Sequence, residues 1–123
     1  MPSASPGCAG QAAEDQALAF LQGHGLQLLT RNWRCTGGEL DLVMLDADTV
    51  VFVEVRYRWH AQFGGALGSI DGRKQQRLAL AANLFLQHEP RWADQPCRFD
   101  VVALQGQGHA GQPLQWLKNA FEC

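Results

Sequence analysis

Two apolar runs decide the fold, Gly38-Glu39-Leu40-Asp41-Leu42-Val43-Met44-Leu45 and Val50-Val51-Phe52-Val53-Glu54-Val55-Arg56. Their aliphatic and β-branched residues predict two strands, and the polar residues 46–49 between them predict a hairpin loop. Each strand carries a carboxylate inside its apolar run, Asp41 in the first and Glu54 thirteen residues later in the second. Burying a carboxylate is costly unless a proton, a cation or hydrogen bonds compensate. The two acids therefore require a chemical explanation.

Period-two strand geometry puts Glu39 and Asp41 on one face of the first strand, and Glu54 and Arg56 on one face of the second. If the strands pair as a hairpin, three acids and a guanidinium converge. Magnesium prefers hard oxygen ligands and keeps several waters, so Asp41, Glu54 and the backbone carbonyl of Val55 are candidate ligands. Such an ion would polarise a phosphoryl oxygen and acidify a water. The alternative is a cross-strand ion pair of Asp41 or Glu54 with Arg56 on a solvated sheet face.

The flanking sequence predicts further strands and two helices. We expect a helix at 11–22, strands at 26–33, 38–45 and 50–58, a helix at 69–88 capped by Ser69 or Asp71, and strands at 99–104 and 114–121. The order α-β-β-β-α-β-β predicts an α/β fold with a mixed sheet and helices packed on it. Residues 1–10 are expected to form a flexible tail before a single domain at 11–123.

Composition indicates a globular chain: 123 residues, 46% hydrophobic, 18% charged, with a net charge of −2. The four cysteines, at 8, 35, 97 and 123, form no C-x-x-C pair and are expected to be free thiols. A zinc site is disfavoured because no Cys or His pair has close ligand spacing. The sequence shows no secretory signal pattern and no apolar run that could span a bilayer, so we expect a cytoplasmic protein.

The sequence also resembles the YraN family of small bacterial proteins, over roughly residues 11–121. The resemblance rests on Glu14, Arg31-Asn32-Trp33-Arg34, Gly38-Glu39-Leu40-Asp41-Leu42-Val43, Val51-Phe52-Val53-Glu54-Val55-Arg56, Ser69-Ile70, Lys74, Arg77-Leu78, Arg98-Phe99-Asp100-Val101-Val102 and Asn119-Ala120-Phe121. It implies a restriction-endonuclease-like core, beside archaeal Holliday-junction resolvases and other PD-(D/E)xK nucleases. Resolvase-like relatives act as symmetric dimers, which makes a homodimer an expectation for this chain.

The resemblance also implies roles in a magnesium- or manganese-dependent hydrolysis of phosphodiesters. Asp41 matches the first acid of the pattern, Glu54 the second, and Glu14 the additional helix-borne acid. Arg56 stands where the pattern has its catalytic lysine, and an arginine stays charged and cannot act as a general base. Lys74 is the candidate replacement; the alternative is an ordinary solvated lysine on a helix face.

Basic residues flank the acids and are expected to contact phosphates: Arg31, Arg34, Arg58, Arg73, Lys74 and Arg77. Trp59 and Phe63 are candidates for stacking on unpaired bases, whereas Trp33 is expected in the core. Arg98 and Asp100 are expected to form a structural ion pair. The leading hypothesis is a nuclease for branched or otherwise structured DNA. Its rivals are a non-catalytic nucleic-acid-binding module and, third, a protein-interaction scaffold.

Overall fold

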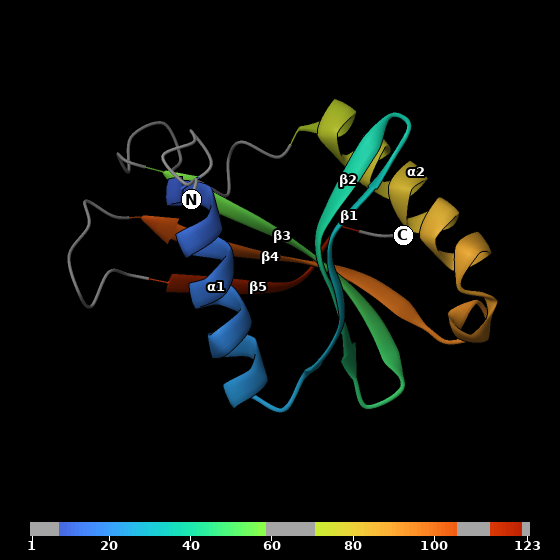
Figure 1. Ribbon diagram of the computed structural model, residues 1–123, viewed down its shortest axis with the longest axis horizontal. Coiled ribbons are helices and arrows are strands. Elements are labelled where there is room, and N and C mark those ends of the chain that lie inside the picture. Colours follow the sequence, from blue (N-terminus) through green and yellow to red (C-terminus); the bar gives the residue numbers. More distant parts are fainter. Residues whose placement is uncertain (1–7, 59–70, 106–113, 122–123) are drawn as a thin grey trace.

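The computed structural model describes residues 8–58, 71–105 and 114–121, which form one mixed sheet and its helices (Figure 1). The elements follow in the order α1 (Cys8–Gly23), β1 (Gln27–Cys35), β2 (Gly38–Asp46), β3 (Thr49–Arg58), α2 (Gly72–His88), the 3-10 helix η2 (Pro90–Trp92), β4 (Cys97–Gln105) and β5 (Leu114–Phe121). The predicted element order is confirmed. Helix α1 begins three residues earlier than expected, within the stretch assigned to the tail, and the hairpin loop has two residues, 47 and 48.

The strands lie side by side in the order β1-β2-β3-β4-β5. Among the described strands only β3 and β4 pair in parallel, and α2 lies in the connection between them, as parallel neighbours require. The two helices cover opposite faces of the sheet (Figure 1). Helix α1 packs on Val51 and Val53, whereas α2 packs on Val50 and Phe52. Because both faces are covered, β3 is apolar at consecutive positions.

Strands β2 and β3 diverge at the acidic residues. Their ladder runs from Asp46 opposite Thr49 to Leu42 opposite Val53 and includes no pair beyond that point. The β1 ladder, in contrast, continues along β2 as far as Gly38. The β1–β2 hairpin therefore turns away from β3 toward α2, as Figure 1 shows. In continued register Asp41 would face Glu54, so both acids lie where the strands separate; we call this place the fork.

Helix α2 begins as its cap predicts. The Asp71 carboxylate accepts a hydrogen bond from the Lys74 N–H at 2.9 Å, with Asp71 itself in an extended conformation. The helix buries an apolar stripe formed by Leu78, Ala81, Ala82 and Phe85. Trp33 meets the Phe85 ring edge-on with centroids 5.5 Å apart, which confirms its place in the core. Ser69 and the segment 59–68 lie outside the described residues.

The predicted ion pair between Arg98 and Asp100 is confirmed, with Nε 2.9 Å from Oδ1. Asp100 is fully buried and also accepts hydrogen bonds from Trp116 Nε1 at 3.0 Å and from the Asn119 N–H at 2.9 Å. The β4–β5 register shifts between Phe99 and Val101, and Asn119 has a φ of 53°. The carboxylate thus binds backbone where the ladder is interrupted. Arg98 also reaches Asp46 at 3.0 Å.

Two further expectations concern cysteines and the membrane. Within the described part of the chain Cys35 and Cys97 form no disulfide, as predicted, whereas the side chains of Cys8 and Cys123 are outside what the structure describes. None of the described helices is long and apolar enough to cross a membrane.

Candidate functional site

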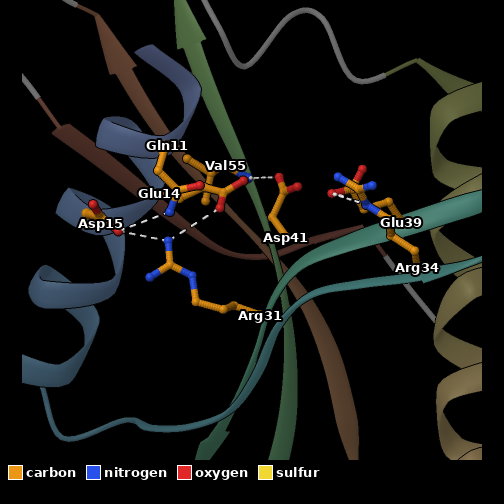
Figure 2. Close-up of polar contacts among 8 residues, drawn as sticks. All are labelled: Gln11, Glu14, Asp15, Arg31, Arg34, Glu39, Asp41 and Val55. Atoms are coloured by element: carbon orange, nitrogen blue, oxygen red, sulfur yellow. Dashed lines mark hydrogen bonds and ion pairs between the residues drawn. The ribbon is translucent and has the colours of Figure 1, made fainter. Parts of the chain in front are cut away.

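A backbone amide fixes Asp41 at the fork. Its Oδ2 accepts a hydrogen bond from the Val55 N–H at 2.9 Å (Figure 2). If the antiparallel register continued past Leu42 and Val53, Val55 would pair with Leu40. The Asp41 side chain therefore takes a donor that a regular ladder would give to β2 backbone. Such a bond satisfies the Val55 N–H, which has no backbone partner on β2, and holds the carboxylate beside Glu54.

The electrostatics at Asp41 are those of a crowded acid site. Burial is the main cause that raises its pKa from 3.8 to about 7, and the charge of Glu54 is the second. The Val55 hydrogen bond lowers the pKa but does not offset these effects, and Glu14 and Glu39 raise it further. Three acids from α1, β2 and β3 thus act on one carboxyl group. Such a place favours a proton or a bound cation.

Glu54 is buried, with only 4% of its surface exposed, and two cations hold it. Its Oε2 lies 3.0 Å from Arg56 NH1 and 3.4 Å from Lys74 Nζ. The ion pair of Glu54 with Arg56 that the alternative named is present, but it lies along β3 and involves a buried acid, not two strands on a solvated face. Lys74 is partly exposed, and its ammonium reaches the fork from α2.

Glu14 projects from α1 toward the region of Asp41 and Val55 (Figure 2). Its carboxylate is 3.4 Å from Arg31 NH2, which also lies 2.8 Å from Asp15 Oδ1. Arg31 therefore connects β1 to α1, because its guanidinium forms ion pairs with two acids of that helix. This arrangement differs from the phosphate contact expected of Arg31. Glu14 still affects the fork, since its charge raises the pKa of Asp41.

The metal ligands expected from the sequence are only partly assembled. Within residues 8–58, 71–105 and 114–121, no three His, Cys, Asp or Glu side chains are grouped closely enough to hold a metal ion. Glu54 is turned to its two cations and Glu14 to Arg31. The donors at the fork, two carboxylates and the Val55 carbonyl, are hard oxygens, which fit Mg²⁺ or Mn²⁺ with waters completing the shell.

The other predicted phosphate contacts are distributed around the fork. Arg73 and Arg77 are exposed on α2, and Arg34 is 77% exposed, 3.7 Å from Glu39. Arg58 ends β3, but its side chain, Trp59 and Phe63 lie outside the described residues. The sequence named Lys74 as the candidate replacement for the catalytic lysine, and its Nζ does reach Glu54, but no local reason for that approach was drawn from the sequence. The signal was present: Asp71 caps α2, which fixes Lys74 in its first turn.

Fold and site together define a class, a small mixed α/β protein with an acid pair at a strand fork and two cations on the second acid. The chain belongs to the uncharacterised protein family UPF0102, whose model matches residues 13–104. It is 87% identical to a UPF0102 protein of Pseudomonas entomophila and 81% identical to one of Pseudomonas putida strain GB-1, each over the full length of both chains. A UPF0102 protein of Pseudomonas fluorescens strain Pf0-1 is 62% identical over 99% of each chain.

These comparisons confirm the family resemblance seen in the sequence. The matched range contains all the residues that form the fork and its surroundings: Glu14, Asp41, Glu54, Val55, Arg56 and Lys74. The names of these relatives state family membership and no activity. Function has to be argued from the site.

Proposed function

We propose that this protein is a cytoplasmic nuclease-like enzyme that hydrolyses phosphodiesters in structured or branched DNA with Mg²⁺ or Mn²⁺. One observation carries the proposal: Asp41 is pinned by the Val55 N–H beside the buried Glu54, in a place where three acids raise its pKa. A structural carboxylate would be expected to face cations there. Acids that repel one another in a buried place are typical of a site that a divalent ion completes.

Asp41 and Glu54 would hold the ion, together with the Val55 carbonyl and, directly or through water, Glu14. When bound, the ion supplies Lewis-acid polarisation of the phosphoryl oxygen and makes a water easier to deprotonate. Glu54 must then exchange part of its contact with Lys74 and Arg56 for the ion. That exchange frees positive charge beside the acids, where the scissile phosphate would lie.

Arg56 and Lys74 would have different tasks. The guanidinium of Arg56 offers a fork of donors that suits a phosphate and keeps its charge throughout. Lys74 is a compact donor from a second element and is the group able to give or take a proton. The pairing supports a nuclease pattern in which the lysine comes from α2 and β3 supplies an arginine.

The test is cleavage of four-way junction, flap, duplex and single-stranded DNA with Mg²⁺, Mn²⁺ or EDTA. We expect metal-dependent cleavage, strongest on the structured substrates and lost on replacement of Asp41 or Glu54 by alanine. Binding without cleavage under every metal would reject the enzyme. It would favour a non-catalytic nucleic-acid-binding module, for which the pairing of Glu54 with two cations of the protein is the supporting observation.

Arg56→Lys is expected to keep cleavage within about threefold of the wild type or to raise it, because lysine retains the charge beside Glu54 and adds a compact donor. Steady-state cleavage with Mn²⁺ measures this. The matched control is Arg73→Lys, the same change at an exposed position of α2. A loss beyond about a hundredfold for Arg56→Lys alone would mean that the planar guanidinium has a task lysine cannot perform.

A further inference from the structure

A pocket of about 470 Å³ lies between the β1–β2 turn and the first turns of α2. Its lining comes from both elements: Arg34, Cys35, Gly37, Gly38 and Glu39 on the hairpin, and Lys74, Arg77 and Leu78 on the helix. The volume falls within the range of about 300–1,000 Å³ typical of small-molecule sites. The pocket exists because the hairpin turns away from β3 at the fork and approaches α2.

The lining is cationic on balance. The lining contains three basic residues, Arg34, Lys74 and Arg77, and one acid, Glu39. The Glu39 carboxylate lies 3.7 Å from Arg34 Nε. Lys74 belongs to both places, because its Nζ also lies 3.4 Å from Glu54. The pocket therefore adjoins the fork, and an anion in it would share a cation with the acid site. This excess of positive charge favours a phosphate group.

The glycine turn makes one wall of this pocket a fixed surface. A Cβ on Gly38 would lie 3.0 Å from the Arg77 carbonyl oxygen and 3.3 Å from Ala81 Cβ, so any larger residue would push the turn away from α2 by a few tenths of an ångström. Gly37 has a φ of +92°, which also favours glycine. Cys35 Sγ, at 3.5 Å, donates to the Gly38 carbonyl. A wall held in this way needs little ordering when a ligand binds.

We propose that this pocket binds a backbone phosphate of an unpaired DNA strand and thereby places the adjoining phosphodiester at Asp41 and Glu54. This inference rests on the proposed function and adds its substrate class. Because the pocket is open between the β1–β2 turn and α2, a flexible single strand can bend to lay one phosphate between them, whereas a duplex presents its phosphates on a broad convex surface. The described lining residues offer a strand cations for its phosphates and no aromatic ring, so the contacts that they make are independent of base sequence.

The first test compares Arg77→Glu with Arg91→Glu, the same charge reversal at two exposed arginines, of which only Arg77 lines the pocket. Affinity is measured by fluorescence anisotropy in EDTA, so that no cleavage occurs. We expect Arg77→Glu to weaken binding of single-stranded and overhang DNA about tenfold, and Arg91→Glu by less than about threefold. Duplex binding should change little and equally in both. Equal losses for the two variants on single strands would overturn the proposal.

The second test locates the strand directly. Cys35 lines the pocket, whereas Cys97 begins β4 beside Val50 and serves as an internal control. We expect single-stranded DNA to slow alkylation of Cys35, followed by peptide mass spectrometry, without slowing that of Cys97. The protection should be absent in Arg77→Glu at the same DNA concentration. Unchanged alkylation of Cys35 on saturated wild-type protein would place the strand elsewhere and reject the proposal.

A free nucleotide carries the same phosphate chemistry and is tested with a deoxynucleoside monophosphate as competitor. The proposal requires that it displace the strand only at concentrations far above those of the oligonucleotide. Tight binding of the monophosphate, equal to that of the strand, would instead indicate a small-molecule site. Because these measurements need no metal, the two proposals can fail separately. Strand binding in the pocket without cleavage would support the pocket and reject the nuclease. Cleavage without strand binding in the pocket would support the nuclease and reject the pocket.

Discussion

Asp41→Asn is expected to abolish metal-dependent cleavage while making the metal-free protein more stable at pH 8. Asparagine can still accept the Val55 N–H through its amide oxygen, so the fork keeps its anchor. It removes the charge that burial and the neighbouring acids oppose. Loss of even an outer-shell partner typically costs a metal site about 10–100-fold, and we expect at least about a hundredfold here for a ligand. Opposite effects on activity and stability distinguish a functional acid from a structural one.

The sign of the stability effect follows from linkage. The pKa of Asp41 is about 7 in the folded protein and 3.8 is its ordinary value, so the folded state binds the proton more tightly. The protonated acid is tolerated at low pH, and stability is lost as the pH rises from about 4 to about 7. A pKa difference of about three between the folded and unfolded protein corresponds to roughly 4 kcal/mol. We therefore expect Asp41→Asn to raise the free energy of unfolding at pH 8 by about 2–4 kcal/mol.

Urea unfolding in EDTA at pH 4.5 and pH 8 measures this gain in the free energy of unfolding. Asp48→Asn, an exposed acid in the hairpin loop, is the matched control and should change stability little at either pH. Equal stability of wild type and Asp41→Asn at pH 8 would contradict the electrostatic description of the fork. A destabilised Asp41→Asn would show that the charge of Asp41 serves the fold.

Asp100→Asn is expected to destabilise the protein by about 3–5 kcal/mol, the cost typical of breaking a buried ion pair from one side. Asp100 has no exposed surface and accepts from Arg98, Trp116 and the Asn119 backbone. An asparagine at this position would point its NH2 group at groups that are themselves hydrogen-bond donors. It would also leave the Arg98 guanidinium, which is 19% exposed, without its buried counter-charge. For a domain whose total stability is about 5–15 kcal/mol, the change is large.

Chemical denaturation at pH 7 measures this loss, with Asp46→Asn as its control. Asp46 also pairs with Arg98, at 3.0 Å, but is 37% exposed, so its replacement should cost less than about 1 kcal/mol. A similar cost for both variants would mean that burial of Asp100 contributes nothing beyond an ordinary surface pair. Nuclease activity of folded Asp100→Asn protein should be retained at temperatures well below its midpoint.

Asp41 and Asp100 make the same kind of backbone hydrogen bond in different electrostatic surroundings. Each carboxylate accepts a backbone N–H where a β-ladder is interrupted. Asp100 has the guanidinium of Arg98 beside it, and its charge is balanced within the protein. The charged groups that most affect the pKa of Asp41 are acids. This contrast is the physical reason to assign structure to one carboxylate and chemistry to the other.

Much of the fold could be predicted from the sequence because its signals are local. The Asp71 cap, the apolar stripe of α2 and the spacing of Arg98 and Asp100 each act over a few residues. Local signals missed the start of α1 and the length of the hairpin loop, because element ends carry the weakest sequence pattern. Strand alternation together with the predicted hairpin brought Asp41 and Glu54 to one region.

The details of the site could not be predicted, because they depend on long-range geometry. The end of the β2–β3 ladder at Leu42 and Val53 depends on how the β1–β2 turn packs against α2. That same packing creates the pocket and brings Lys74 within 3.4 Å of Glu54, twenty residues away in sequence. The engagement of Arg31 by Glu14 and Asp15 depends likewise on how α1 crosses β1.

Anomalous diffraction from a crystal soaked in Mn²⁺ at pH 8 tests the central claim most directly, because it locates the metal independently of any substrate. We expect one manganese peak at the fork, bound by the Asp41 and Glu54 carboxylates and the Val55 carbonyl, with Glu54 moved away from Lys74. No manganese between the two acids, with Glu54 still paired to Lys74 and Arg56, would contradict the proposed metal centre.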